Sequence, residues 1–224
     1  MAQPVVPFPA SAGTVLLPGP AGMLELSVDL PDPADALAGV AIVCHPHPLE
    51  GGTMHNKVVT MAARSLRELG LATVRFNFRG VGESQGGYDN GRGETLDLLS
   101  VAQWVQQALP GRALWLAGFS FGAWIALLGA RDLPVAQLIS IAPPAGRWDF
   151  SGVLAPSCPW LVIQGDADDI VAPHAVYDWI AKLGAHPTLV KMPDTGHFFH
   201  RRLMDLRGAI KNGVRRNLPP PLHG

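Results

Sequence analysis

The chain of 224 residues has little cysteine and little charge. Its two cysteines, Cys44 and Cys158, lie far apart in the sequence, so they form neither a disulfide framework nor a zinc-binding motif. Both fall in apolar stretches, where we expect buried free thiols. Charged residues make up 16% of the chain and the formal net charge is −1. This balance excludes a bulk electrostatic attraction to nucleic acid or to an anionic membrane.

Long apolar runs are also missing. The first residues, MAQPVVPFPASAG, lack a basic region followed by an extended apolar core, and no run of 18 apolar residues occurs later. We therefore expect a soluble cytoplasmic protein that binds neither nucleic acid nor a membrane. Apolar residues at 48% are enough for one large core. We expect a single domain over residues 1–224, with its core at about 14–215 and a flexible C-terminal tail at 219–224.

Short β-rich apolar runs alternate along the chain with segments of helical periodicity. Strands are predicted over residues 40–44, 72–76, 113–118, 137–142, 160–164 and 188–192. Several of these runs are apolar at consecutive positions, which is typical of strands covered on both faces. Apolar residues at helical spacing predict helices over residues 58–69, 98–109, 121–130 and 203–214. Asn56 is expected to cap the first helix, and Gly70 to end it.

This alternation predicts an α/β fold with a doubly wound, mostly parallel sheet. Residues 14–17 and 24–30, separated by Pro18-Gly19-Pro20, predict an antiparallel N-terminal hairpin that extends the edge of the sheet. Only 17 residues, 143–159, join the strand predicted over 137–142 to the strand predicted over 160–164, and four of them are proline. So short a connection leaves room for no lid, or for a minimal one.

The pentapeptide Gly118-Phe119-Ser120-Phe121-Gly122 has the pattern G-x-S-x-G. It follows a predicted strand directly and precedes an apolar helix, which is the context that a nucleophile elbow requires. A sharp turn there presents the serine hydroxyl above the carboxyl ends of the strands, and the flanking glycines remove side chains that would clash. Ser120 is therefore the predicted nucleophile.

A serine hydroxyl needs a base and an acid partner, because it is a poor nucleophile at neutral pH. If the serine, the acid and the histidine come in this order along the chain, each should lie on a loop at the carboxyl end of a strand. His197 follows the last strand and is the predicted base, whereas His200 is expected inside the last helix. The preceding strand runs into an acidic loop in which Asp168 is the predicted acid. Asp166 and Asp169 lie in the same loop, where an aspartate can also form a turn by accepting backbone hydrogen bonds.

Two backbone N–H groups are needed to stabilise an oxyanion. Phe121, the residue after the nucleophile, should supply one of them. The second should come from the loop after the strand at 40–44, where Pro46 and Pro48 have no N–H to give. The predicted donor is His47. On the short connection at 143–159, Trp148 and Phe150 are the predicted substrate-binding side chains.

The loops also suggest two other kinds of site. A metal site has possible ligands in His45, His47, Glu50 and His55, but no helix with the H-E-x-x-H pattern completes it. The glycine-rich run at 80–87 follows a strand as a dinucleotide-binding loop does. Its third glycine falls one place late, and no helix opens there. We therefore expect no metal and no cofactor, and we interpret the run at 80–87 as an active-site rim.

These motifs resemble the α/β-hydrolase superfamily over about residues 14–215. Within it, HPHPLEGGTMHNKVV (45–59) and RFNFRGVGESQGGYDNGRGE (75–94) resemble a small bacterial group of lidless predicted hydrolases in the dienelactone-hydrolase-like and serine-peptidase-like branches. The resemblance implies a triad of Ser120, Asp168 and His197 and says little about the substrate. Serine at 120 argues against the chemistry of dienelactone hydrolases, which use cysteine, and of haloalkane dehalogenases, which use aspartate.

The sequence thus predicts a cofactor-free serine hydrolase that cleaves small carboxylic esters or thioesters through an acyl-enzyme intermediate. Two alternatives remain open at this point: a peptidase or amidase with the same triad, and a non-catalytic binding protein with the same fold. The sequence leaves the natural substrate and the oligomeric state undetermined.

Overall fold

A computed structural model describes residues 6–222. It contains one eight-stranded sheet in the order β1-β2-β4-β3-β5-β6-β7-β8. The strands are β1 Gly13–Gly19, β2 Gly22–Asp29, β3 Gly39–Cys44, β4 Ala72–Phe76, β5 Ala113–Phe119, β6 Val135–Ile141, β7 Trp160–Gly165 and β8 Thr188–Met192. The α-helices are α1 Lys57–Arg67, α2 Arg92–Ala108, α3 Phe121–Gly129, α4 Pro173–Lys182 and α5 Leu203–Val214.

Strands β3 to β8 run parallel to one another, and β2 lies antiparallel to both β1 and β4. The predicted α/β-hydrolase fold, with its parallel sheet and antiparallel N-terminal hairpin, is confirmed. The hairpin turn differs from the prediction. It lies at Pro20-Ala21, because Gly19 pairs with Gly22, whose φ of 121° suits glycine. The strand β1 therefore extends through Pro18, which was expected in the turn.

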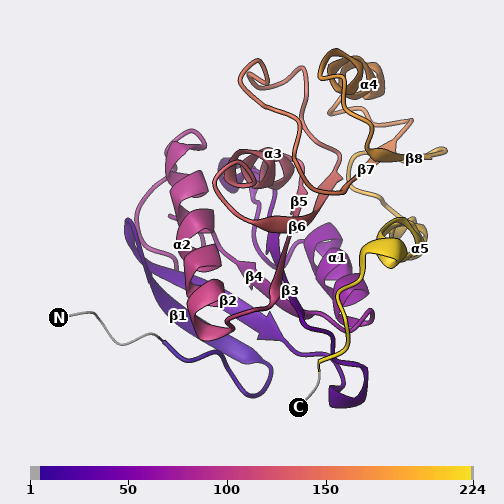
Figure 1. Cartoon of the computed structure of the whole chain (residues 1–224). Helices are drawn as coiled ribbons and strands as arrows, with labels where there is room; N and C mark the ends of the chain where they lie inside the picture. Colours follow the sequence, from indigo (N-terminus) through magenta and orange to yellow (C-terminus); the bar gives the residue numbers. More distant parts are fainter. Residues whose placement is uncertain (1–5, 223–224) are drawn as a thin grey trace.

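Helices cover both faces of the sheet (Figure 1). Helices α2, α3 and α4 pack on one face and α1 and α5 on the other, so that two separate apolar cores sandwich the strands. All six residues of β3 are buried, as expected for a strand in the middle of such a sandwich. Asn56 caps α1 as predicted, since its side chain accepts the N–H of Val58 at 2.9 Å.

Helix α4 was not predicted from the sequence. It begins with Pro173 in its first turn, where a missing N–H costs nothing. Only Val176, Trp179 and Ile180 are buried among its ten residues. This narrow apolar stripe is a weak periodic signal. Packing against β7 and the β6–β7 connection therefore stabilises α4 more than its own apolar pattern does.

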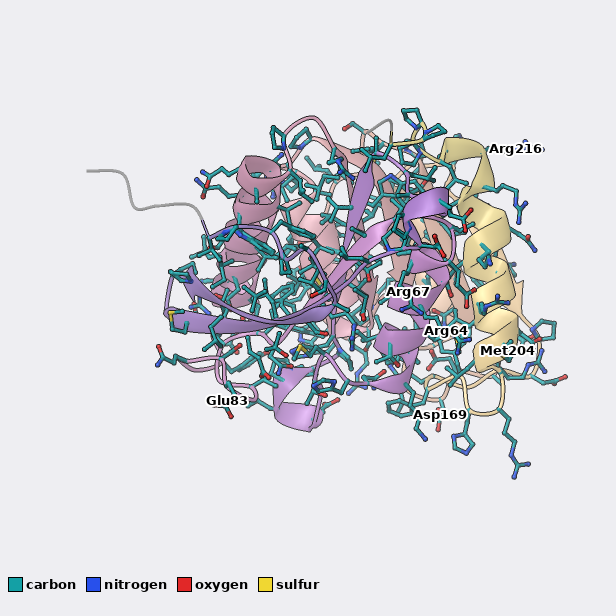
Figure 2. The ribbon with its side chains drawn as sticks, turned by 90° about the horizontal axis from the view of Figure 1, so that it is seen from below. Arg64, Arg67, Glu83, Asp169, Met204 and Arg216 are labelled. Carbon is teal, nitrogen blue, oxygen red and sulfur yellow. The ribbon has the colours of Figure 1, made fainter. Side chains whose placement is uncertain are left out.

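Ion pairs connect basic residues of α5 to the C-terminal end of α1. Arg207 Nε donates to Glu68 Oε2 at 2.7 Å, and Lys211 lies 3.2 Å from the same oxygen. Arg64 pairs with the other carboxylate oxygen of Glu68 at 3.0 Å. Figure 2 shows the two helices side by side, with Arg64 and Arg67 on α1 and Met204 on α5.

The end of the chain corrects another expectation. Residues 219–222 were predicted to belong to a flexible tail, but two backbone hydrogen bonds tie them to the segment before β3. Ala38 N–H donates to Pro220 O and Leu222 N–H to Ala36 O, each at 2.8 Å. A segment without periodicity can still be fixed by such pairing, which the sequence does not reveal. Residues 223–224 lie outside the described residues.

The β6–β7 connection contains no helix or strand between residues 142 and 159, all of which the structure describes. Turns and one isolated bridge, Ala145 to Trp148, make up this segment. The carboxyl edge of the sheet is therefore not covered by a lid at this connection, as predicted. None of the helices within residues 6–222 has both the length and the hydropathy of a membrane span.

Candidate active site

Ser120 lies in a strained turn between β5 and α3. Its φ of 53° and ψ of −120° are rare for a residue with a side chain. The two glycines of the motif are required sterically. A Cβ on Gly118 would collide with the Gly122 carbonyl, and a Cβ on Gly122 would collide with the carbonyls of Cys44 and His45. The turn therefore has the geometry of a nucleophile elbow.

The structure brings Ser120, His197 and Asp168 together. Ser120 Oγ lies 3.0 Å from His197 Nε2, and His197 Nδ1 lies 2.9 Å from Asp168 Oδ2. The three residues follow β5, β8 and β7, whose carboxyl ends meet at one edge of the sheet. Because Asp168 accepts the Nδ1 proton, the neutral imidazole has a free Nε2 lone pair that faces the serine hydroxyl.

Asp168 is held in place by several donors. Its Oδ1 accepts the backbone N–H groups of Ile170 at 2.9 Å and Val171 at 2.7 Å, and its Oδ2 accepts Gln164 Nε2 at 3.0 Å. Burial raises the pKa of Asp168, but the hydrogen bonds from His197 and from the two backbone groups outweigh burial and bring the pKa below its ordinary value. The carboxyl group is therefore a fixed anion at neutral pH.

The competing acids and the competing base lie elsewhere. Asp166 and Asp169 are exposed, and Figure 2 shows Asp169 at the periphery of the molecule. His200 was expected inside the last helix, but α5 begins at Leu203 and His200 is exposed in the loop before it. The three positive φ angles at Asp194, Phe199 and Arg201 keep this loop irregular, which delays the start of the helix.

The two predicted oxyanion donors lie where their N–H groups are free. Phe121 is the first residue of α3, so its N–H has no partner inside the helix. No hydrogen bond among residues 6–222 uses the backbone N–H of His47. The rings of His47 and Phe121 pack edge to face with centroids 5.1 Å apart, which places the two residues side by side.

Five rings form an aromatic cluster beside these donors. The cluster consists of His47, Tyr88, Phe121, Trp124 and Trp148. The Trp148 ring lies parallel to both His47, at 5.5 Å, and Trp124, at 6.1 Å, and contacts Phe121 edge-on. Trp148 is half-buried, so part of its ring is accessible to solvent.

Phe150, the second predicted substrate-binding residue, does not belong to the aromatic cluster. It is 8% exposed and packs edge to face on Trp179 of α4, with ring centroids 4.8 Å apart. The sequence places Trp148 and Phe150 two residues apart on one loop, but the turn between them sends the two rings to different neighbours. We therefore correct the prediction for Phe150 and assign it to the core.

Tyr88 was missed by the sequence analysis. Its hydroxyl lies 3.1 Å from His47 Nε2, while His47 Nδ1 accepts the N–H of Leu49. This pairing fixes the imidazole with its proton on Nε2, which donates to Tyr88. Glu94 of α2 holds the loop by accepting the N–H groups of Asp89 and Gly91. An acidic residue three positions after a glycine at a helix start was the available signal.

His45, one of the possible metal ligands, is completely buried, and both of its ring nitrogens form hydrogen bonds. Nδ1 lies 2.6 Å from Pro46 O and donates to it, and Nε2 accepts the Phe78 N–H at 3.0 Å. Burial lowers the pKa of His45 to about 4, although the bond to Pro46 opposes the change. The neutral ring thus ties the loop that carries His47 to the segment after β4.

We expect this neutral His45 to make the fold sensitive to acid. Its pKa lies near 4 in the folded chain and near 6.5 when unfolded, so the unfolded state binds more protons between these values. The free energy of unfolding should fall by up to about 3 kcal/mol as the pH drops through this window, and then level off for this group. Urea unfolding at a series of pH values measures the change.

A His45→Gln variant provides the control for this experiment. Glutamine retains a donor and an acceptor but does not titrate, so the variant should be less stable at neutral pH and should have a smaller slope between pH 6.5 and 4. Carboxylates with lowered pKa values, such as Asp168, destabilise both proteins alike as the pH falls, so they do not contribute to the difference between the two slopes. Equal slopes in the two proteins between pH 6.5 and 4 would contradict the assignment to His45.

The fold, the elbow and the arrangement of Ser120, His197 and Asp168 together define an α/β-hydrolase of the serine type. A family model of the alpha/beta hydrolase fold matches residues 49–154. A serine α/β-hydrolase from Xanthomonas campestris, described as lacking a lid, is 60% identical, covers 97% of this chain and 100% of its own, and superposes with a TM-score of 0.93. The chain belongs to this family of lidless α/β serine hydrolases.

Other relatives agree with this assignment. An α/β serine hydrolase homologue from Coxiella burnetii is 45% identical, with 92% of this chain and 99% of its own covered and a TM-score of 0.89. An uncharacterised protein from Rickettsia prowazekii is 38% identical over an alignment of 185 residues that covers 78% of this chain and 78% of its own. A dienelactone hydrolase from Anabaena variabilis, at 18% identity and a TM-score of 0.77, covers 93% of this chain and 98% of its own and shares the fold alone.

Proposed function

We propose that this protein hydrolyses small carboxylic esters or thioesters through an acyl-enzyme intermediate. The observation that carries the proposal is the continuous hydrogen-bonded series from Ser120 Oγ through the His197 imidazole to the Asp168 carboxylate. The series lies at the carboxyl ends of β5, β7 and β8 and uses a nucleophile held in a strained turn. We retain the expected cytoplasmic location as part of this proposal.

In the first half-reaction Ser120 Oγ attacks the carbonyl carbon while His197 Nε2 accepts the hydroxyl proton. The carbonyl oxygen becomes an oxyanion, which the N–H groups of His47 and Phe121 stabilise. Asp168 keeps the imidazole in the required tautomer and stabilises its charged form. His197 then gives the proton to the departing alcohol or thiol, and the carbon–oxygen or carbon–sulfur bond breaks, leaving an ester on Ser120.

In the second half-reaction water replaces the alcohol or thiol. His197 accepts a proton from the water, whose oxygen attacks the acyl carbon, and returns the proton to Ser120 Oγ as the acid leaves. Atoms and charges balance over the two halves, and every proton transfer uses Nε2 of one imidazole.

The aromatic cluster supports the restriction to small acyl groups. Phe121 supplies an oxyanion donor from its backbone and contacts Trp148 with its ring, so the acyl group faces this wall. The Trp148 ring already fills the space between its two parallel neighbours, His47 and Trp124. Residues 142–159 form no helix that would extend the aromatic cluster outward. Each methylene beyond the wall remains in water and adds none of the ~0.8 kcal/mol that its burial would contribute.

A series of p-nitrophenyl esters tests the proposal. We expect kcat/KM to be highest between acetate and butyrate and not to rise with longer chains, because only the first carbons contact the aromatic cluster. Activation at a lipid interface should be absent, since no lid has to open. A steady increase of kcat/KM through decanoate would contradict the small-acyl proposal, and hydrolysis of none of the esters would favour the non-catalytic alternative.

A further inference from the structure

A surface depression is lined by Phe198, the residue that follows His197. This groove has a volume of about 330 Å³ and lies between the loop before α1 and the loop after β8. We call it the His55–His200 groove, and its larger side chains are His55, Asn56, Lys57, Phe198 and His200. The mechanism described above uses none of these side chains.

The position of the groove relates it to the leaving group. Phe198 follows His197 directly, and the two rings pack edge to face with centroids 5.2 Å apart. On the opposite wall, Gly51 belongs to the loop of the proposed oxyanion donor His47. His197 must hand its proton to the departing alcohol or thiol, so the rest of that fragment leaves the carbonyl on the His197 side. Because Phe198 both lines the groove and packs on the His197 ring, the groove is within reach of that fragment.

Phe198 is held outward by its neighbours. Phe199 has a φ of 53° and buries its ring completely in the core that contains α5, whereas Phe198 is 58% exposed. An aromatic ring that stays in water at the rim of a reaction site loses the stabilisation that burial would give it. A ligand that covers this ring recovers that stabilisation.

The formally charged side chain in the groove is a cation. Lys57, His55 and His200 are exposed and line it, and no acidic side chain does so within the described residues. Lys57 makes none of the ion pairs formed among residues 6–222. It also opposes the dipole of α1, because it is a cation in the first turn of a helix that has no acid there. Its placement therefore does not serve the stability of the helix.

We propose that the His55–His200 groove binds the leaving group of the substrate and selects an alcohol or thiol that bears an anionic group, a carboxylate or a phosphate. Lys57 attracts the anion, the two imidazoles offer hydrogen bonds, and Phe198 covers the apolar part of the same fragment. This inference rests on the proposed function, since it assigns the second half of the ester that Ser120 attacks.

Three acetate esters with the same acyl group test the inference at pH 8. They are 4-acetoxybenzoate, 4-acetoxyphenyl phosphate and the uncharged methyl 4-acetoxybenzoate. Replacing one exposed charge near another changes kcat/KM by about three- to fivefold. Lys57→Met should therefore lower kcat/KM for an anionic ester relative to the methyl ester by about this factor, and Lys57→Glu by about tenfold or more. The anionic ester that shows the larger change tells whether the groove prefers a carboxylate or a phosphate.

Two controls separate this effect from a general loss. Lys182→Met removes an exposed lysine of α4 that lines a different depression, and it should leave the ratio unchanged. Raising the salt concentration to about 0.5 M should reduce the preference of the wild type, because the charges are then screened. If Lys57→Met changes all three esters equally, or none of them, the groove does not select an anion. If the wild type hydrolyses none of the esters, the proposed function fails and this inference fails with it.

Discussion

Ser120→Ala should abolish ester hydrolysis, with a loss in kcat of about 10⁴-fold or more. The variant has no atom that can form the acyl-enzyme, and the remaining N–H groups of His47 and Phe121 can stabilise only a slow attack by water. Stability should change little, by about 1 kcal/mol, because one hydrogen bond between Ser120 and His197 is lost and the strained backbone at residue 120 is unchanged.

The loss is measured with purified protein on p-nitrophenyl acetate and with a fluorophosphonate, which labels an activated serine covalently. The label should be found on Ser120 in the wild type and be absent from the variant. Ser100→Ala is the matched control, since Ser100 lies on α2 and makes one long hydrogen bond of 3.5 Å. This control should keep both turnover and labelling. Unchanged turnover in Ser120→Ala would overturn the assignment of the nucleophile.

The central part of the site was predictable because each residue follows a strand. Once the runs ending near Gly118, Gln164 and Met192 are recognised as parallel strands, their following loops must share one edge of the sheet. Ser120, Asp168 and His197 then have few competitors within those loops. The G-x-S-x-G motif predicts that a side chain at either glycine would clash. In the structure, the atoms that such a side chain would meet are backbone carbonyls.

The features that escaped prediction depend on contacts between distant parts of the chain. Tyr88 reaches His47 because Glu94 anchors its loop, and the loop sequence alone gives no direction to the ring. Phe150 and Trp148 diverge because their turn is irregular. The C-terminal residues 219–222 are ordered by pairing with residues 36–38, a contact that no local pattern encodes.

The choice among three neighbouring acids is the next decisive test. Asp168→Asn should reduce kcat by about 10⁴-fold at neutral pH. The asparagine oxygen can still accept the N–H groups of Ile170 and Val171, so its amide NH₂ must face His197 Nδ1. A donor in this position requires Nδ1 to accept, which moves the imidazole proton to Nε2. A protonated Nε2 cannot take the proton of Ser120, and the charged imidazole also loses its counterion.

Asp169→Asn is the matched control, because it makes the same chemical change one residue away. Asp169 is exposed, and the hydrogen-bond partners of His197 are Asp168 and Ser120, so kcat should stay within about twofold of the wild type, as for other surface substitutions. Both variants should unfold cooperatively, with Asp168→Asn the less stable, since the buried carboxylate loses charge-assisted hydrogen bonds worth about 1.5–3 kcal/mol each. A large loss in Asp169→Asn with normal activity in Asp168→Asn would move the acid to Asp169. Large losses in both would indicate that the whole acidic loop has shifted, which the denaturation midpoints of the two variants would reveal.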